Sequence, residues 1–210
     1  KGSYIRLSDF KGAKVQSPRT LEAIKNPECG WFYQSDQNDF SKIPGTPIGY
    51  WVSERIFSLF VNGTSLNNIA SPRQGIATAD NNRFLKFWFE VPITNVYFHC
   101  EEEKDSIRSN IKWYPYQKGG EFRKWYGNNL YVINWRNNGE ELRAFKRSVI
   151  RNPNYFFREG ITWTSLTSGN FNARLSRKGN LFDSKGPVLF QESQKELYTL
   201  NYLLGVLNCK

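Results

Sequence analysis

Short segments that alternate between apolar and polar residues, or run apolar, recur along the chain and predict β-strands. Such segments occupy residues 4–7, 31–33, 48–53, 85–91, 96–98, 130–135, 161–164, 171–175 and 181–183. The segments 161–164 and 171–175 are separated by a small polar stretch, so we expect them to pair. The pattern predicts a protein rich in β structure.

Helical spacing of apolar residues is found in fewer places, at residues 18–24, 54–60, 140–149 and 195–207. The helix 54–60 is expected to end at Asn62-Gly63, because glycine commonly terminates helices. With the strands, these helices predict an α+β fold in which the helices are peripheral. Residues 74–84 carry many short polar side chains between apolar stretches, which is typical of an ordered loop that points side chains outward.

We place a domain boundary just before this loop. Residues 1–70 are then expected to form a small α/β connector region, and residues 71–210 a β-rich domain. With 210 residues, of which 39% are hydrophobic, the chain is long enough to bury a substantial core. It has no apolar run long enough to span a bilayer and no signal-peptide pattern. We therefore expect a soluble, intracellular protein without a membrane partner.

Cysteine and histidine usage argues against several classes of site. The three cysteines, Cys29, Cys100 and Cys209, are isolated, and the chain has a single histidine. This pattern lacks the spacing of a zinc ribbon or a disulfide framework, so no metal site is expected. Small thiols in a reducing compartment are the better interpretation.

The distribution of charge is more informative than its total of +10. Residues 1–107 hold 12 Lys/Arg and 12 Asp/Glu, whereas residues 108–185 hold 15 and 5. A surplus of one sign confined to one stretch creates a local positive field that attracts polyanions. Nucleic acid is therefore the leading partner.

Aromatic residues are interleaved with these charges, for example in residues 112–118 and 122–126. Such rings can stack on bases while Lys and Arg neutralise phosphates. For any single Trp or Tyr, a place in the hydrophobic core is the better interpretation. For the basic block as a whole, nucleic-acid binding is favoured.

Three candidate catalytic patterns fail on inspection. Residues 152–155 (Asn-Pro-Asn-Tyr) approach the Asn-Pro-Pro-Tyr signature of amino-methyltransferases, but no Gly-rich cofactor turn precedes them, so a turn is the favoured interpretation. Glu102-Glu103-Lys104 has the Glu-x-Lys spacing of metal-dependent nucleases but is most simply a solvated loop. His99 has no nucleophile elbow to serve. We expect no catalytic residues and no metal in this chain.

Binding residues are better supported. Side chains able to contact base edges or phosphates cluster in and beside the polar loop, and basic residues of the charged block would contact phosphates. The predicted DNA-binding residues are Arg73, Gln74, Thr78, Asn81, Asn82, Arg83, Lys118, Arg123, Lys124, Arg174 and Lys178.

Several stretches carry a family resemblance. Residues 72–84 (Pro-Arg-Gln-Gly-Ile-Ala-Thr-Ala-Asp-Asn-Asn-Arg-Phe) resemble the signature that opens target-recognition domains in large adenine-specific restriction-modification enzymes. With residues 112–116, 119–128 and 151–163, and the upstream stretches 4–7, 21–27 and 47–53, they are similar to the C-terminal half of the adenine-specific DNA methyltransferases of bacterial BREX phage-defence systems. The sequence departs from the broader signature at Ala79, where that signature has Gly. A tight turn at this position favours glycine, because glycine adopts positive φ without a steric penalty.

The resemblance implies that residues 71–210 form a target-recognition domain for double-stranded DNA. It also implies that S-adenosylmethionine and adenine methylation belong to an N-terminal methyltransferase domain absent from this sequence. Two alternatives stay open. The aromatic surface would dock that domain or another defence-system protein, or the chain would bind single-stranded nucleic acid by stacking.

Overall fold

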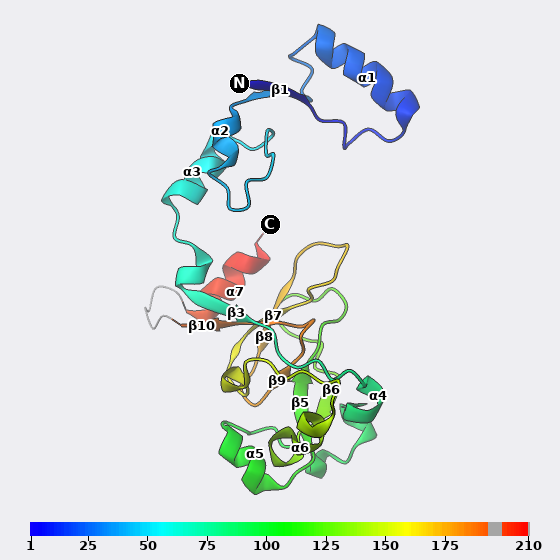
Figure 1. Ribbon diagram of the computed structural model, residues 1–210, viewed down its shortest axis with the longest axis vertical. Coiled ribbons are helices and arrows are strands. Elements are labelled where there is room, and N and C mark those ends of the chain that lie inside the picture. Colours follow the sequence, from blue (N-terminus) through cyan, green and yellow to red (C-terminus); the bar gives the residue numbers. More distant parts are fainter. Residues whose placement is uncertain (193–198, 210) are drawn as a thin grey trace. The chain divides into compact units, whose positions relative to one another are not determined.

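The computed structural model describes residues 1–192 and 199–209. The chain divides into two compact units, Lys1–Ser65 and Leu66–Lys210, each described by itself (Figure 1). The functional division predicted above, with a recognition domain at residues 71–210, stays a prediction.

The smaller unit is built on a two-stranded antiparallel sheet of β1 (Gly2–Ile5) and β2 (Phe32–Ser35). Helix α1 (Ala13–Lys25) connects the strands, and the short α2 (Gln37–Phe40) follows β2. Helix α1 begins before the predicted residue 18 and contains Pro18. The last helix, α3 (Glu54–Asn62), ends at Gly63 as predicted.

The predicted strand at residues 48–53 is wrong. Ile48 is 63% exposed and Trp51 48% exposed. The backbone turns here, because the Gly49 N–H donates to the Pro47 carbonyl at 2.7 Å. The segment is held by its side chains, since the Tyr50 ring stacks on the ring of Tyr4 with centroids 4.7 Å apart. An apolar run without a neighbouring strand has no ladder to join.

In its described residues, the larger unit contains two four-stranded sheets (Figure 1). The first, in the order β3-β10-β7-β8, is antiparallel and consists of β3 (Ala70–Arg73), β10 (Val188–Gln191), β7 (Gly160–Trp163) and β8 (Ala173–Ser176). The second, in the order β4-β6-β5-β9, consists of β4 (Leu85–Phe87), β6 (Tyr131–Asn134), β5 (Trp113–Gln117) and β9 (Leu181–Phe182). Its β5–β9 pair is parallel.

Helices lie around these sheets and confirm the α+β class. They are α4 (Asn81–Phe84), α5 (Glu103–Ser109), α6 (Arg136–Ala144) and α7 (Leu200–Asn208), with 3-10 turns η1 (Leu66–Asn68), η2 (Trp88–Glu90), η3 (Ile93–Asn95) and η4 (Pro153–Tyr155). Figure 1 shows α7 beside the first sheet and α5 and α6 beside the second.

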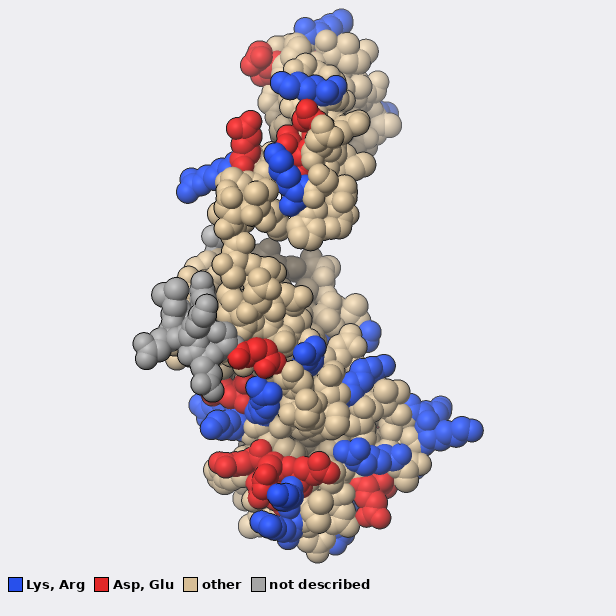
Figure 2. Space-filling view, turned by 60° about the vertical axis from the view of Figure 1, so that its left-hand side comes forward, with Lys and Arg blue, Asp and Glu red and all other residues tan. Residues whose placement is uncertain are grey.

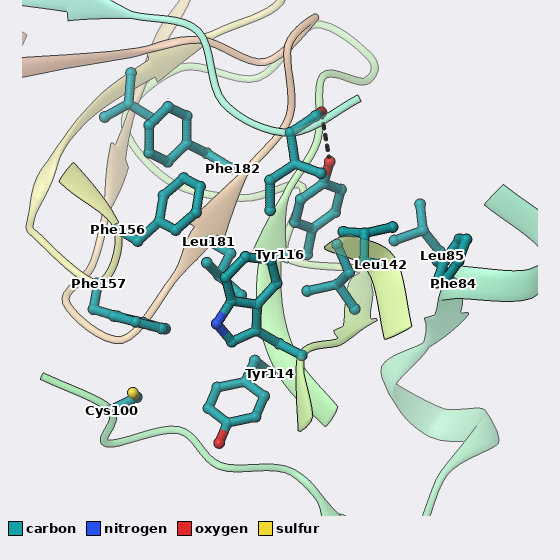
Figure 3. Packing of buried hydrophobic residues seen from close by; sticks show 14 of the residues in the cluster. Phe84, Leu85, Cys100, Tyr114, Tyr116, Leu142, Phe156, Phe157, Leu181 and Phe182 are labelled. Carbon is teal, nitrogen blue, oxygen red and sulfur yellow. Dashed lines mark hydrogen bonds between the residues drawn. The ribbon is translucent and has the colours of Figure 1, made fainter. Parts of the chain in front are cut away.

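The main core of the larger unit is aromatic. Trp135, Tyr114 and Phe182 are at most 2% exposed, and Phe156 packs edge-on against both Trp135 and Phe182 (Figure 3). A second cluster joins the first sheet to α7 through Ile161, Leu189 and Leu203, among others. Burial of these side chains provides the main driving force for folding of this unit.

The strand predictions for this unit have mixed outcomes. The predicted pairing of 161–164 with 171–175 is confirmed by β7 and β8, and the strands at 130–135 and 181–183 by β6 and β9. The strand at 85–91 ends at Phe87, and residues 96–98 form only an isolated bridge at Val96. Strands β3, β5 and β10 were not predicted.

One helix prediction is corrected in length, and another lies partly outside the described residues. The right-handed part of α6 is short, because Asn137, Asn138 and Gly139 are left-handed and the helix ends at Ala144 instead of 149. Asn and Gly are the residues that most readily adopt that conformation. The C-terminal helix begins at Leu200, and the predicted positions 195–198 lie outside the described residues.

Candidate nucleic-acid interface

A cavity of about 640 Å³ opens beside the second sheet of the larger unit. Strands β5 and β6 contribute Pro115, Tyr116, Tyr131 and Val132 to its lining. The other lining residues come from turns and loops and are Trp88, Phe98, His99, Tyr126, Asn129, Glu159, Arg177, Lys178 and Asn180. Aromatic faces and cationic side chains therefore share one concave surface, which we call the groove.

Cations and rings are in direct contact here. The Arg177 guanidinium lies 4.9 Å from the centre of the Tyr126 ring, and the Lys118 ammonium lies 5.2 Å from the centre of the Tyr131 ring. Lys178, next to Arg177, is exposed. A low-dielectric wall beside accessible cations strengthens their attraction for anions. The groove therefore offers positive charge for phosphates and flat rings for bases.

The loop at residues 119–128 carries exposed aromatic residues to one side of this groove. Phe122, Trp125 and Tyr126 are 56%, 53% and 51% exposed. The loop is tied to β8, because the Trp125 N–H donates to the Ala173 carbonyl and the Leu175 N–H donates to the Trp125 carbonyl, each at 2.9 Å. These rings are consequently held out from the fold on a fixed backbone.

Arg174, predicted to contact phosphate, is instead buried, with 0% exposure. Its guanidinium donates to the Asn172 carboxamide oxygen at 2.6 Å and to the Arg123 carbonyl at 3.4 Å. Burial lowers its pKa. This burial was not predicted, because residue type reveals charge but not that both faces of β8 are covered, so that Ala173, Arg174 and Ser176 are all buried. Arg174 therefore supports the loop 119–128 from its buried side, through the hydrogen bond to the Arg123 carbonyl.

The other predicted phosphate contacts are distributed differently. Arg123 and Lys178 are exposed and Lys118 is half-buried, and of these Lys178 lines the groove. The Lys124 side chain is engaged in an internal hydrogen bond, because its ammonium donates to the Asn208 carbonyl at the end of α7 at 2.5 Å.

In the polar loop, Arg73 and Gln74 are linked to the turn at residues 152–155. The Arg73 guanidinium lies 4.9 Å from the Tyr155 ring centre and donates to the Tyr155 hydroxyl at 3.2 Å. The carbonyl of Gln74 accepts from the Asn152 side chain at 2.9 Å. Gln74 itself is exposed.

The remaining loop candidates divide into buried and exposed groups. Thr78 is 3% exposed, and its hydroxyl donates to the Asn81 carboxamide oxygen at 2.7 Å, so it organises the loop and does not face a ligand. Asn81 and Asn82 are exposed at the start of α4. Arg83 is exposed but pairs with Glu141 at 2.9 Å, and this hydrogen bond lowers the pKa of Glu141.

The start of the polar loop is anchored to the core by a buried phenol. The Tyr116 hydroxyl donates to the Ile76 carbonyl at 3.1 Å, drawn as the dashed line in Figure 3, and to the Asp183 carboxylate at 3.0 Å. Burial, with the nearby Asp183 charge, raises the pKa of Tyr116 well above its ordinary value. None of the six loop candidates lines the groove, so the two predicted groups do not share that cavity.

The rejected catalytic patterns occupy structural positions. Residues 152–155 form the turn that the sequence favoured, with Asn152 left-handed and Tyr155 donating to the Glu192 carboxylate at 2.8 Å. Glu102 begins helix α5, and the Glu101 and Glu102 N–H groups both donate to the Asp105 carboxylate at 3.1 Å. His99 lines the groove, a position the catalytic search could not suggest.

Sequence reasoning also missed Arg177, Tyr126, Asn129 and Asn180 as lining residues. The adjacent Arg-Lys pair at 177–178 was a usable signal for Arg177. Tyr126 lay inside the aromatic-basic stretch but was not singled out. The two asparagines have no sequence signal that separates them from other loop residues.

On the face drawn in Figure 2, Lys and Arg side chains of the larger unit are interspersed with Asp and Glu. The described residues contain no helix long and apolar enough to cross a membrane. Within the same residues, no cluster of His, Cys, Asp and Glu is suited to a metal ion.

Comparison with known proteins identifies relatives. No family model matches the chain. It is 41% identical over 215 aligned residues to the adenine-specific methyltransferase PglX of Lacticaseibacillus casei strain Zhang, and this alignment covers 99% of the chain. It is 39% identical over 181 residues to the adenine-specific methyltransferase BrxX of Escherichia coli O9:H4 strain HS, which covers 85%. The chain is homologous to part of PglX and BrxX. The predicted resemblance is confirmed.

The match spans only 18% of PglX and 14% of BrxX. The resemblance to adenine-specific methyltransferases implies S-adenosylmethionine as the cofactor of the whole protein. Nucleotide-like cofactors commonly bind where a Gly-rich turn leads from a strand into a helix. The turn from β6 into α6 does not fit, because a Cβ added at Gly139 would lie 2.6 Å from the Trp135 ring, which already fills the space.

Proposed function

We propose that this chain recognises double-stranded DNA on behalf of an adenine-N6 DNA methyltransferase of bacterial phage defence. The observation that carries the proposal is the groove, in which Arg177 and Lys178 lie beside exposed aromatic rings. Homology to adenine-specific methyltransferases supports DNA as the polyanion. In this proposal S-adenosylmethionine binds to a methyltransferase domain outside these 210 residues, and the whole protein acts in the bacterial cytoplasm.

The recognition steps follow from where the side chains lie. Arg177, Lys178 and Arg123 neutralise backbone phosphates and set the position of the duplex. The exposed amides of Gln74 and Asn82 have the paired donors and acceptors that read adenine edges in the major groove, whereas the Asn81 carboxamide oxygen already accepts from Thr78. Arg73 and Arg83 are held by Tyr155 and Glu141, and they contact DNA only after leaving those partners.

A salt titration tests the phosphate contacts. Labelled duplex is titrated with the chain at several salt concentrations, and the affinity of the unaltered chain is expected to fall steeply as salt rises. The double variant Arg177→Gln with Lys178→Gln removes two phosphate contacts. The plot of log affinity against log salt then becomes shallower, and the magnitude of its slope falls by about 2. The matched control is Lys11→Gln with Lys14→Gln, which removes two exposed charges from the smaller unit.

Salt-independent binding, or equal slopes for the two double variants, contradicts the proposal. A preference for single strands over duplex would instead favour binding by base stacking alone.

A second candidate function rests on the smaller unit. Its helices expose large apolar side chains, including Leu21 and Ile24 on α1, and Leu59 and Val61 on α3, each at least 56% exposed. Exposed apolar surface of this kind marks protein interfaces. We propose that this unit docks the methyltransferase domain or another defence-system protein. Amides of α3 would then exchange hydrogen more slowly in the longer parent protein than in this chain, and equal exchange would contradict docking.

A further inference from the structure

Three aromatic rings beside the groove form a continuous stack. The Tyr131 ring lies on the Phe87 ring with centroids 5.0 Å apart and planes at 27°. The Phe87 ring lies on the Phe89 ring with centroids 5.2 Å apart and planes at 4°. The stack ends at Phe89, which is 64% exposed. A large flat ring therefore faces solvent at the end of an ordered column.

The end of the column is held in place. The Phe87 N–H donates to the Glu90 carboxylate at 2.7 Å, which closes the η2 turn, and the Trp88 N–H donates to the Leu130 carbonyl at 3.0 Å. Trp88 packs edge-on against Phe89 with centroids 5.8 Å apart. Because Phe89 is positioned before a ligand arrives, little conformational entropy is lost when another ring stacks on it.

The surroundings indicate the chemistry of that ligand. Trp88, which packs edge-on against Phe89, lines the groove together with Arg177 and Lys178, and so does Tyr131 at the other end of the stack. Lys118 lies 5.2 Å from the Tyr131 ring centre. An exposed flat ring beside a groove that holds cations matches a nucleobase with its attached phosphates better than an apolar peptide.

We propose that the stack Tyr131–Phe87–Phe89 is extended by one unpaired nucleobase of the bound DNA, which lies on the outer face of Phe89. The base must be unpaired, because the faces of a paired base inside a duplex are already covered by its neighbours. This assignment rests on the proposed DNA recognition. It adds that the chain binds a locally opened duplex in preference to a fully paired one.

The test compares two labelled duplexes of the same sequence, one fully paired and one with a single extra adenine. The unaltered chain is expected to bind the bulged duplex about 5- to 150-fold more tightly, the range for stacking of one base. Phe89→Leu keeps an apolar side chain without a flat face, so it loses this preference and keeps its affinity for paired duplex. Phe89→Tyr keeps the preference. Phe171→Leu, at a residue 49% exposed elsewhere in the same unit, is the matched control.

A second measurement reports stacking directly. With 2-aminopurine as the extra base, its fluorescence is expected to fall on binding to the unaltered chain and to Phe89→Tyr, but not on binding to Phe89→Leu. Equal affinity for both duplexes, or a preference and quenching that survive in Phe89→Leu, overturns the assignment while leaving DNA recognition intact. Failure to bind either duplex overturns both proposals.

Discussion

The guanidinium of Arg174 donates a hydrogen bond to the backbone carbonyl of Arg123, 3.4 Å away and 51 positions earlier in the chain. Arg123 belongs to the loop that presents Trp125 and Tyr126 to solvent. A buried cation thus supports an exposed aromatic-basic loop. Arg174 therefore affects the groove by positioning the backbone of this loop, and not by contacting a ligand itself.

Arg174→Met tests this supporting role. Loss of the hydrogen bonds to Arg123 and Asn172 is partly offset because a buried charge no longer needs to be desolvated, so we expect a change in unfolding free energy of no more than about 2 kcal/mol. The Trp125 amide, bonded to Ala173, is expected to exchange hydrogen faster. The salt slope of DNA binding is expected to stay unchanged. A slope lowered by about 1 would show that Arg174 contacts phosphate after all.

Ala79 offers a stability prediction, because it adopts φ 56°. The left-handed region costs a residue with a Cβ roughly 1–2 kcal/mol, whereas Gly loses roughly 0.5–1 kcal/mol of backbone entropy. We expect Ala79→Gly to raise the unfolding free energy by up to about 1 kcal/mol in urea denaturation. The control is Ala77→Gly, at a residue paired with Val149, which is expected to destabilise. Destabilisation by Ala79→Gly would contradict the argument.

The departure at Ala79 illustrates what the sequence can reveal. Comparison with the signature marked a position that favours positive φ, and the backbone has that conformation. The Asn-Asn-Gly run at 137–139 carries a similar signal, because Asn and Gly adopt positive φ most readily, and all three residues are left-handed. Local signals of this kind are readable because they depend on one residue's own sterics.

Long-range placement was not readable. Val188, Leu189 and Phe190 are a continuous apolar run, which is typical of a central strand, and β10 does lie between β3 and β7. The similar run at 48–53 lies outside any sheet. The two differ in whether a neighbouring strand is available, which depends on distant residues. For the same reason the burial of Arg174 and the meeting of Tyr126 with Arg177 were not predicted from the sequence.

Tyr116→Phe tests the anchor of the polar loop. The substitution removes the hydrogen bonds to Ile76 and to the buried Asp183 carboxylate. We expect a loss of about 1–3 kcal/mol in unfolding free energy, because a buried acceptor then lacks a donor. The control is Tyr4→Phe in the smaller unit, where the ring can still stack on Tyr50. Equal stability of the two variants would show that the anchor contributes nothing.

Alkaline pH is expected to destabilise the folded chain through two buried acidic groups, the Cys100 thiol and the Tyr114 phenol. Burial raises the pKa of Cys100 from 9.0 to about 12 and that of Tyr114 from 10.0 to about 12. The unfolded chain therefore releases these protons at lower pH than the folded chain does. The corresponding stability is fully present below pH 9 and is lost progressively as pH rises from 9 toward 12.

Urea denaturation at a series of pH values measures this loss. We expect Tyr114→Phe to flatten the fall in unfolding free energy above pH 10, and Cys100→Ser to flatten it above pH 9, because each variant lacks one titrating group. Tyr126→Phe is the matched control, since Tyr126 is 51% exposed and its phenol is not in the core. If both core variants lose stability with the same slope as the unaltered chain, the alkaline transition has another origin.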